Sequence, residues 1–401
     1  MAASADRYDV LFLTHNFPRH SADFAGRFLV RLATQVQRRG LRVAVLAPHH
    51  ARATLEETID GVYVRRFRYA PDDDEQIAYR GEWGGLSFLG ARGLWAHARF
   101  LRSFHSAARQ IDEESNPTAI HAHWWVPAGW VARRLVRGRH LVVTLHGADL
   151  RLLQRKRWLR PLAACVLGRA DIVTVVSSPL AHMLSGWFPR AAHKVQVAPM
   201  PPDDSIFMPP SGARVVNDPP LIVCVTRYTA QKRNDVLVKA LAILRQRGIK
   251  FRVRLIGEGG DLRPAIERQI SESGLGMSVE LVRSMDQRAL ADVYRRADVV
   301  VLPAVDEGFG LVLVEAQLCG CAVVGVSSGG IPDIISPEVS GLLARPDDPG
   351  DLADVLARVL GDGDLRDRLG RGGLAWAQER FSSAAIVDRF VAWYGAHGQA
   401  R

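Results

Sequence analysis

The sequence lacks the features expected of a membrane-spanning or secreted chain. It has no run of about 18 apolar residues, so no transmembrane segment is expected. The chain starts MAASADRYDVLFLT, where acidic residues interrupt a short apolar part, which favours a first strand over a signal peptide. The only four cysteines, Cys165, Cys224, Cys319 and Cys321, lie in apolar runs without zinc-knuckle or CxxC spacing. We expect buried, reduced thiols in a cytoplasmic protein.

Aromatic residues make up 7% of the chain, charged residues 23% and hydrophobic residues 48%. This ordinary globular composition excludes a disordered protein, a coiled coil and a collagen-like fibre. A length of 401 residues predicts two domains, each large enough to bury its own core.

Positive charge is unevenly distributed. The formal net charge is +10, and residues 1–200 hold 28 basic and 16 acidic side chains, so the second half is nearly neutral. An anionic partner of the first half is one explanation: a membrane surface, an acidic substrate or nucleic acid. An arginine-rich proteome is the other.

Short apolar runs alternate with helical patterns throughout, which predicts two doubly wound α/β domains with parallel strands covered on both faces. Strands are expected at Tyr8–Leu13, Val43–Ala47, Val62–Arg66, Ala119–His123, Leu141–Thr144, Ile172–Val176, Val195–Ala198, Leu221–Val225, Arg252–Ile256, Ser278–Val282, Val299–Leu302, Ala322–Val326 and Gly341–Leu343. Helices are expected at Ala25–Arg39, Leu94–Gln110, Pro127–Val136, Leu150–Leu167, Pro179–Trp187, Asp235–Arg247, Leu262–Ser273, Gln287–Arg295, Leu311–Leu318, Leu352–Leu360, Asp364–Glu379 and Ser382–Tyr394.

The alternation lapses around Pro199–Pro220, which has seven prolines and no periodicity. We therefore expect an N-terminal domain at 1–200, a linker at 201–220, a second domain at 221–381 and a terminal helix at 382–401 that packs back on the first domain. Two such domains facing each other would form a deep cleft, because ligands of these sheets bind outside the carboxyl ends of the strands.

The most informative motif is Glu307-Gly308-Phe309-Gly310-Leu311-Val312-Leu313-Val314-Glu315, which follows an apolar run and opens a helix. Its backbone N–H groups suit an anion, and its two carboxylates suit sugar hydroxyls. Arg227 and Lys232 follow another strand and suit a diphosphate. Together these loops predict a nucleotide-sugar site. The plain alternative for each charge is a solvated surface residue.

Three further motifs are weaker. His146 follows a strand and would face the cleft, although a buried structural histidine is the commoner case. His121 and His123 follow the same logic, and no carboxylate accompanies them at ligand spacing, so no metal site is expected. The run Gly257-Glu258-Gly259-Gly260 has Leu262 in place of the third glycine of GxGxxG, which disfavours an NAD enzyme.

The ordered set of motifs resembles the retaining glycosyltransferases of family 4, with the two-Rossmann GT-B fold, over nearly the whole chain. NFPRHSADFAGRF, HAHWWVPAG, LVVTLHGAD, TRYTAQK and EGFGLVLVE carry the resemblance. It implies that Arg227 and Lys232 bind the donor diphosphate, Glu307 the transferred sugar and Glu315 the ribose. It also places the N–H groups of Phe309, Gly310 and Leu311 at the phosphate and sugar, His146 near the anomeric carbon, Gly26 at the diphosphate or acceptor, and the base near Val282 and Arg283. The chain has only Gly26 where many members have a glycine-rich loop, and Pro199-Met200-Pro201-Pro202-Asp203 at the junction.

The expected reaction is transfer of a sugar from a UDP- or GDP-sugar to a hydroxyl of a glycan, glycolipid or lipid-linked saccharide, with retention and without a metal or other cofactor. Two basic amphipathic stretches with tryptophans lie at Leu94–Gln110 and Leu150–Leu167. Each by itself is more typical of a surface helix whose apolar face lies in the core, but together with the charge of the first half they indicate peripheral contact with an anionic inner membrane and a role in polysaccharide biosynthesis. Alternatives are a soluble small-molecule acceptor, or an epimerase or phosphorylase on the same fold. Nucleic acid is disfavoured because no basic face with interleaved aromatics is evident.

Overall fold

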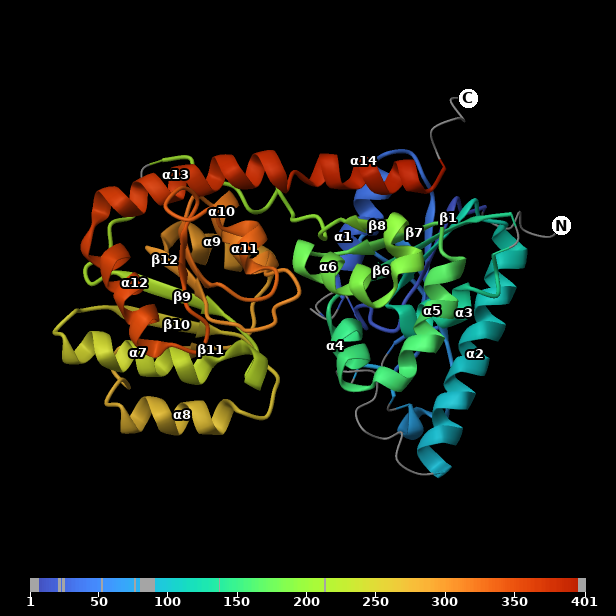
Figure 1. Ribbon diagram of the computed structural model, residues 1–401, viewed down its shortest axis with the longest axis horizontal. Helices are drawn as coiled ribbons and strands as arrows, with labels where there is room; N and C mark the ends of the chain where they lie inside the picture. Colours follow the sequence, from blue (N-terminus) through green and yellow to red (C-terminus); the bar gives the residue numbers. More distant parts are fainter. Residues whose placement is uncertain are drawn as a thin grey trace. The chain divides into compact units, whose positions relative to one another are not determined.

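A computed structural model describes residues 7–395 except 21–22, 24–25, 52, 76, 80–90, 137 and 213. The chain divides into two compact units: unit 1 comprises Met1–Pro201 and Ala384–Arg401, and unit 2 comprises Pro202–Ser383. Each unit has its own sheet (Figure 1).

Unit 1 is built on an eight-stranded sheet in the order β3-β4-β2-β1-β5-β6-β7-β8. The strands are β1 (Val10–Leu13), β2 (Val43–Pro48), β3 (Glu56–Ile59), β4 (Val62–Phe67), β5 (Ala119–His123), β6 (His140–Leu145), β7 (Ile172–Val175) and β8 (Val195–Val197). All neighbours run parallel except the hairpin of β3 with β4. The strand β3, which is charged and half exposed, was not predicted, and it adds one antiparallel edge strand to the sheet.

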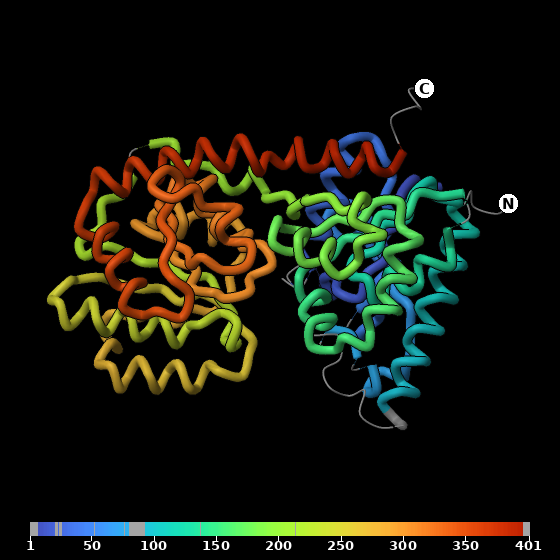
Figure 2. Tube along the Cα trace, viewed as in Figure 1, coloured from blue at the N-terminus to red at the C-terminus, as the bar shows by residue number. Residues whose placement is uncertain are grey.

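Helices cover both faces of the unit 1 sheet. They are α1 (Arg27–Gln37), α2 (Ala91–Ser115), α3 (Trp130–Ala132), α4 (Ala148–Arg155), α5 (Arg160–Arg169), α6 (Ser178–Trp187) and α14 (Ser383–Trp393), with short turns η1 (Asp72–Asp74), η2 (Trp125–Gly129), η3 (Arg157–Leu159) and η4 (Pro189–Lys194). One core joins the sheet to α2–α6, and a second joins its other face to α1 and α14. Ile386, Val387, Phe390 and Tyr394 of the C-terminal segment belong to this second core. The backbone of this segment is the red end of the tube in Figure 2.

Two predicted helices of unit 1 are wrong in extent. The stretch 150–167 is broken into α4, η3 and α5, because Lys156 has non-helical angles (φ −119, ψ 68) and α5 restarts with a proline in its first turn. The stretch 127–136 holds only η2 and the three-residue α3. The predicted helix start at residue 25 lies outside the described residues. Cys165 is exposed, contrary to expectation, whereas the other three thiols are buried.

Unit 2 has a parallel six-stranded sheet in the order β11-β10-β9-β12-β13-β14. Its strands are β9 (Leu221–Val225), β10 (Arg252–Ile256), β11 (Val279–Val282), β12 (Val299–Leu302), β13 (Ala322–Val326) and β14 (Leu342–Ala344). Its helices are α7 (Asn234–Gln246), α8 (Arg263–Glu272), α9 (Gln287–Arg296), α10 (Leu311–Leu318), α11 (Ile331–Ile334), α12 (Pro349–Gly361) and α13 (Gly363–Arg380), with η5 (Ala230–Lys232). The fully apolar strands β12 and β13 are buried along their whole length, as their composition predicts.

The proline-rich segment 202–220 belongs to unit 2. Asn217 donates to the backbone carbonyl of Arg296 and to Asp298, both at 2.8 Å, and Phe207 lies beside Tyr294 with ring centroids 6.0 Å apart. Arg214 donates to the carbonyls of Gly320 and Ala297. These bonds hold an irregular segment against the sheet-bearing unit.

Candidate functional site

In unit 2 the strand order reverses between β9 and β12, which are neighbours in the sheet. Ligands of open parallel sheets bind at such a switch point, outside the carboxyl ends of the strands. Arg227 and Lys232 follow β9, and Glu307 lies between β12 and α10. The topology therefore brings the two sequence motifs of unit 2 to one position.

The two motifs meet through an ion pair. Nζ of Lys232 lies 2.7 Å from Oε2 of Glu307, and their side chains are 20% and 17% exposed. Because both groups are largely shielded from water, this pair is stronger than a surface pair and fixes both side chains. A cation for a diphosphate and a carboxylate for a hydroxyl thus lie side by side.

Buried polar residues hold the Arg227–Lys232 loop. The side-chain amide of Asn234 donates to the carbonyl of Arg227 at 3.0 Å, and Thr226 Oγ1 lies 2.9 Å from Asn234 Oδ1. Gln231 donates to the carbonyl of Asp306 at 2.8 Å, which joins this loop to the one that carries Glu307. Sequence reasoning missed Asn234, although a polar residue at the start of an apolar helix was the available signal.

The glycine run after β10 serves close backbone packing. A Cβ on Gly257 would overlap the carbonyl oxygen of Thr226, and one on Gly260 would overlap that of Tyr228. The amide of Tyr228 donates to the carbonyl of Gly259 at 2.8 Å. A Cβ built on Gly259 would lie 3.8 Å from Nε of Arg227, so this guanidinium lies over the glycine run. These glycines support the cationic loop.

A second glycine pair, missed in the sequence, supports Glu307. Gly329 follows β13 with φ +56, and a Cβ there would overlap the backbone oxygen of Glu307. The amide of Gly330 donates to the same oxygen at 2.8 Å, and Ser328 Oγ accepts from the amide of Asp306 at 3.0 Å. The available signal was the run Ser327-Ser328-Gly329-Gly330 directly after a strand.

Gly329→Ala is therefore expected to displace Glu307, destabilising unit 2 by about 1–3 kcal/mol through overlap and backbone strain. It should lower kcat/KM of sugar transfer at least about tenfold. The matched control is Gly248→Ala, where φ is +75 but no atom lies within 4 Å of the new Cβ. Thermal unfolding and steady-state kinetics of both variants test this, and equal effects would contradict it.

The N-terminus of α10 presents backbone donors beside the ion pair. Gly310 (φ 101) precedes the helix and has no side chain to cap it. The amide of Leu313 donates to the carbonyl of Gly310 at 2.9 Å, which leaves the N–H groups of Leu311 and Val312 as the first-turn donors that suit an anion. Phe309 is 8% exposed and packs edge-to-face on Phe381 at 5.4 Å. Glu315, one helical turn further on, is 6% exposed. The pKa of Tyr294 is raised well above its usual value, first by burial and then by Glu315.

Val282 ends the edge strand β11, and Arg283 follows it. The carbonyl of Val282 accepts from the amide of Gly257 at 3.0 Å, and the Arg283 side chain is 87% exposed and 3.7 Å from Glu258. Both therefore lie at the same carboxyl edge as the ion pair, next to the glycine run.

In unit 1 the order reverses between β1 and β5, and His146 follows β6 at the same edge. Nε2 of His146 lies 3.2 Å from Nδ1 of His123, and its ring packs on Trp124 and Phe28 with centroid distances of 4.4 and 5.1 Å. Burial lowers the pKa of His146 to about 3. Its ring is therefore neutral at physiological pH.

Gly26 precedes α1 with φ +71, and a Cβ there would lie 2.5 Å from the carbonyl oxygen of Asn16. The glycine is thus required by the chain's own loop. Residues 21–22 and 24–25 of that loop lie outside the described residues.

Asp149, in the first turn of α4, is a buried carboxyl three residues after His146 that sequence reasoning did not single out. The carboxyl is 4% exposed, and Oδ1 accepts from the amides of Gly147 and Leu150 at 3.0 and 3.1 Å. Oδ2 has no hydrogen-bond partner within the described chain. Burial raises the pKa of Asp149 to about 7.

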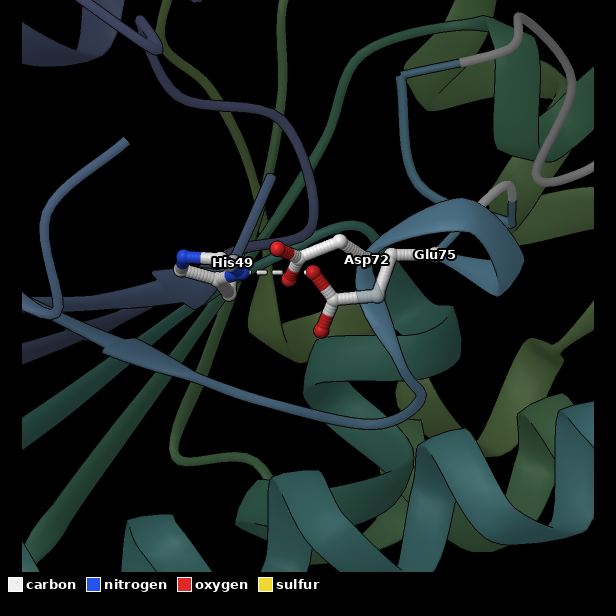
Figure 3. A group of neighbouring side chains, drawn as sticks. All are labelled: His49, Asp72 and Glu75. Atoms are coloured by element: carbon white, nitrogen blue, oxygen red, sulfur yellow. Dashed lines mark hydrogen bonds and ion pairs between the residues drawn. The ribbon is translucent and has the colours of Figure 1, made fainter. Parts of the chain in front are cut away.

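A third group at the carboxyl edge of unit 1, also missed in the sequence, joins His49, Asp72 and Glu75, whose potential ligand atoms lie within 4.8 Å of one another (Figure 3). His49 Nδ1 lies 2.5 Å from Glu75 Oε2, and Nε2 lies 3.0 Å from the carbonyl of Ala53. Both ring nitrogens of His49 therefore face oxygen atoms of this chain.

The fold that these units share, two Rossmann-like domains in one chain, is GT-B. Residues 212–376 match the family model of glycosyl transferases group 1, and residues 25–205 match that of glycosyltransferase family 4. A D-inositol 3-phosphate glycosyltransferase of Streptosporangium roseum is 33% identical over 299 residues, 69% of this chain and 68% of that one. The chain therefore belongs to the glycosyltransferase family that these two models describe, glycosyl transferases group 1 with the N-terminal domain of glycosyltransferase family 4.

Solved structures agree on the fold. Sucrose-phosphate synthase from Thermosynechococcus elongatus superposes with a TM-score of 0.80 at 23% identity, covering 98% of this chain and 99% of that one. Anabaena HepE, in complex with UDP and glucose, superposes with a TM-score of 0.71 at 19% identity, covering 98% and 100%. The predicted GT-B architecture and family are thus confirmed.

Proposed function

We propose that the protein transfers a sugar from a nucleotide-diphosphate sugar to an acceptor hydroxyl, with retention at the anomeric carbon and without a metal. The observation that supports this most is the shielded Lys232–Glu307 pair at the switch point of unit 2. In the proposed reaction, Lys232, Arg227 and the first N–H groups of α10 stabilise the negative charge that develops on the leaving diphosphate. These fixed donors supply the charge that a metal supplies in other phosphoryl leaving-group sites.

Carboxylates orient the polyols in this proposal. Glu307 accepts hydrogen bonds from hydroxyls of the transferred sugar, and Glu315 accepts from the ribose. The acceptor attacks on the face from which the diphosphate leaves, and the leaving phosphate takes the acceptor proton. His146 contacts the donor sugar, Gly26 lies at the diphosphate or acceptor, and Val282 and Arg283 flank the base.

A UDP-sugar is the proposed donor, because a protein of the same fold, HepE, has been crystallised with UDP and glucose. A thermal-shift panel of UDP-, GDP- and ADP-sugars tests this, since a ligand that binds only the folded state raises its stability. A rise in the melting temperature with a UDP-sugar, and a smaller rise in the Lys232→Ala variant, would support a UDP-sugar as the donor. Donor turnover that does not depend on an acceptor would instead indicate an epimerase or phosphorylase.

The acceptor has two candidate classes, and both suit the +12 charge of residues 1–200. A lipid-linked saccharide or glycan in polysaccharide biosynthesis at the cytoplasmic face of a membrane is the first. A small phosphorylated polyol is the second, because the relative that is 33% identical to this chain is a D-inositol 3-phosphate glycosyltransferase. Product formation with inositol 3-phosphate in solution, compared with a polyprenyl-linked saccharide in vesicles, separates the two.

Peripheral membrane contact is proposed from one surface of unit 1. Residues 150–170 hold six basic and no acidic side chains, and Trp158 and Leu162 among them are 69% and 39% exposed. Exposed indole beside arginine and lysine is the composition that binds an anionic lipid surface. No helix in the part of the chain that the structure describes is long and apolar enough to cross a membrane.

The double variant Lys156→Glu/Arg157→Glu is expected to weaken co-sedimentation with anionic vesicles at least about tenfold, because each cation near such a surface contributes about 1 kcal/mol. The matched control is Arg245→Glu/Arg247→Glu, two exposed cations at the end of α7 in unit 2. Equal loss in both variants, or no vesicle binding by the unsubstituted protein at low salt, would contradict the membrane proposal.

A further inference from the structure

Three histidine rings from neighbouring strands form one line of contacts at the carboxyl edge of unit 1. His121 and His123 lie on β5, two residues apart and therefore on the same face of the strand, and His146 follows the adjacent strand β6. The His121 and His123 rings have centroids 4.0 Å apart, and Nδ1 of His123 lies 3.2 Å from Nε2 of His146.

The inner end of this line is fully hydrogen-bonded. His121 has Nδ1 2.7 Å from the hydroxyl of Tyr394 on the C-terminal segment and Nε2 2.6 Å from Oγ1 of Thr144. Thr144 in turn lies 2.5 Å from Oγ1 of Thr174. Because both of its ring nitrogens have hydrogen-bond partners, His121 is held in one orientation, and the ring of His123 packs against it.

His123 and His146 share one hydrogen bond between two neutral rings. Burial lowers the pKa of both, to about 3 for His146, so each ring carries a single proton near neutral pH. Of the facing nitrogens, one must donate and the other accept. The contact geometry alone allows either direction.

The far nitrogen of His123 decides the direction. Nε2 of His123 is buried and has no partner among the described residues. A proton on Nε2 would leave a buried N–H unsatisfied, the rarer and costlier arrangement, whereas a proton on Nδ1 is used in the bond to His146. Nδ1–H of His123 therefore donates to Nε2 of His146.

A neutral His146 whose Nε2 accepts carries its own proton on Nδ1. This ring is partly exposed, and no described residue hydrogen-bonds to its Nδ1. Trp124 and Phe28 enclose the ring and fix its plane. The open nitrogen of His146 is thus an N–H group of defined direction.

We propose that His123 is a positioning residue, which holds His146 in the Nδ1–H tautomer so that His146 offers the reacting sugar a hydrogen-bond donor and not a base. This rests on the proposed function, in which His146 contacts the donor sugar. It specifies that the ligand atom at His146 is a hydroxyl or phosphate oxygen that accepts.

The test compares His123→Asn with His123→Leu. The side-chain amide of asparagine can place an N–H near the position of the imidazole Nδ1, whereas leucine cannot donate. In ¹H–¹⁵N spectra of histidine-labelled protein, His146 should show a protonated Nδ1 and a bare Nε2 in the unsubstituted protein and in His123→Asn. In His123→Leu it should show a mixture of tautomers. The kcat should fall about tenfold in His123→Leu, the effect of about one hydrogen bond, with little change in KM, and His123→Asn should recover most of it.

The matched control is His97→Leu, because His97 is also a buried histidine of unit 1, and its Nδ1 lies 2.8 Å from the carbonyl of Gly93 on its own helix α2. It should leave the His146 resonances unchanged. A proton on Nε2 of His146 in the unsubstituted protein, or an unchanged His146 tautomer in His123→Leu, would overturn the proposal whatever the enzyme transfers. A changed tautomer with unchanged kcat would support the positioning role and contradict the contact of His146 with the sugar.

Discussion

Lys232→Ala is expected to lower kcat/KM about a hundredfold, the typical effect of removing one preorganised donor to a developing anion. The substitution removes a cation proposed for the leaving diphosphate. It also leaves the carboxylate of Glu307, only 17% exposed, without this partner, so that it repels the anionic donor. Steady-state kinetics with the donor found in the thermal-shift panel measure the effect.

The ion pair between Lys232 and Glu307 also predicts how substitutions of the two residues combine. Glu307→Gln and Lys232→Ala should not be additive, because each single change alters the same ion pair, and the double variant should be less impaired than the product of the two predicts. Arg227→Ala should cost at least about tenfold by itself. The control is Arg254→Ala, which breaks an exposed pair with Glu280 at 2.9 Å on β10 and β11. Near wild-type kinetics in Lys232→Ala, Glu307→Ala and Arg227→Ala would contradict the site.

The sequence predicts the buried parallel strands well because burial on both faces leaves a continuous apolar signal. The bounds of β9, β10, β12, β13 and α10 match the predicted ones to the residue. The edge strand β3 was not predicted because its sequence, Glu-Glu-Thr-Ile, has no apolar run. The break at Lys156 was not predicted because the apolar residues of α4 and α5 together keep a helical spacing, in which one residue with non-helical angles leaves no signal.

The site was predictable where a motif is local and not where it depends on contacts between loops. Arg227, Lys232 and Glu307 stand out by their spacing, yet their union depends on the order of β9 and β12 in the sheet. Gly329 and Glu307 are distant in sequence and meet only because β12 and β13 are neighbours. In the same way the bond between His123 and His146 follows from the register of β5 on β6.

The buried titratable groups of unit 1 predict a steep dependence of its stability on pH. Burial lowers the pKa of His15 and His146 to about 3 and that of His121 and His123 well below the usual value. In the unfolded chain these histidines titrate near 6.5, so below that pH the unfolded state binds more protons and the folded state loses stability. Their contribution is complete above about pH 6.5 and falls as the pH drops toward 3.

Asp149 acts in the opposite direction. Its folded pKa of about 7 lies above the unfolded value of 3.8, so between these values the folded state holds the extra proton and stability falls as the pH rises. Around pH 5 the four histidines outweigh this one carboxyl. The free energy of unfolding should therefore decrease by several kcal/mol between pH 6.5 and pH 5, at about 1.4 kcal/mol per pH unit for each net proton.

Two substitutions should change this slope in opposite senses, which separates the histidine effect from general acid sensitivity. His15→Gln removes one proton of uptake on unfolding and flattens the dependence, whereas Asp149→Asn removes the opposing group and steepens it. His182→Asn, at an exposed position of α6, is the matched control and should leave the slope unchanged. Of the nine tryptophans only Trp376 lies in unit 2, so urea unfolding followed by fluorescence in a Trp376→Phe background reports unit 1. Equal slopes in His15→Gln and Asp149→Asn would contradict the assignment, because the two groups bind their protons in opposite states of the chain.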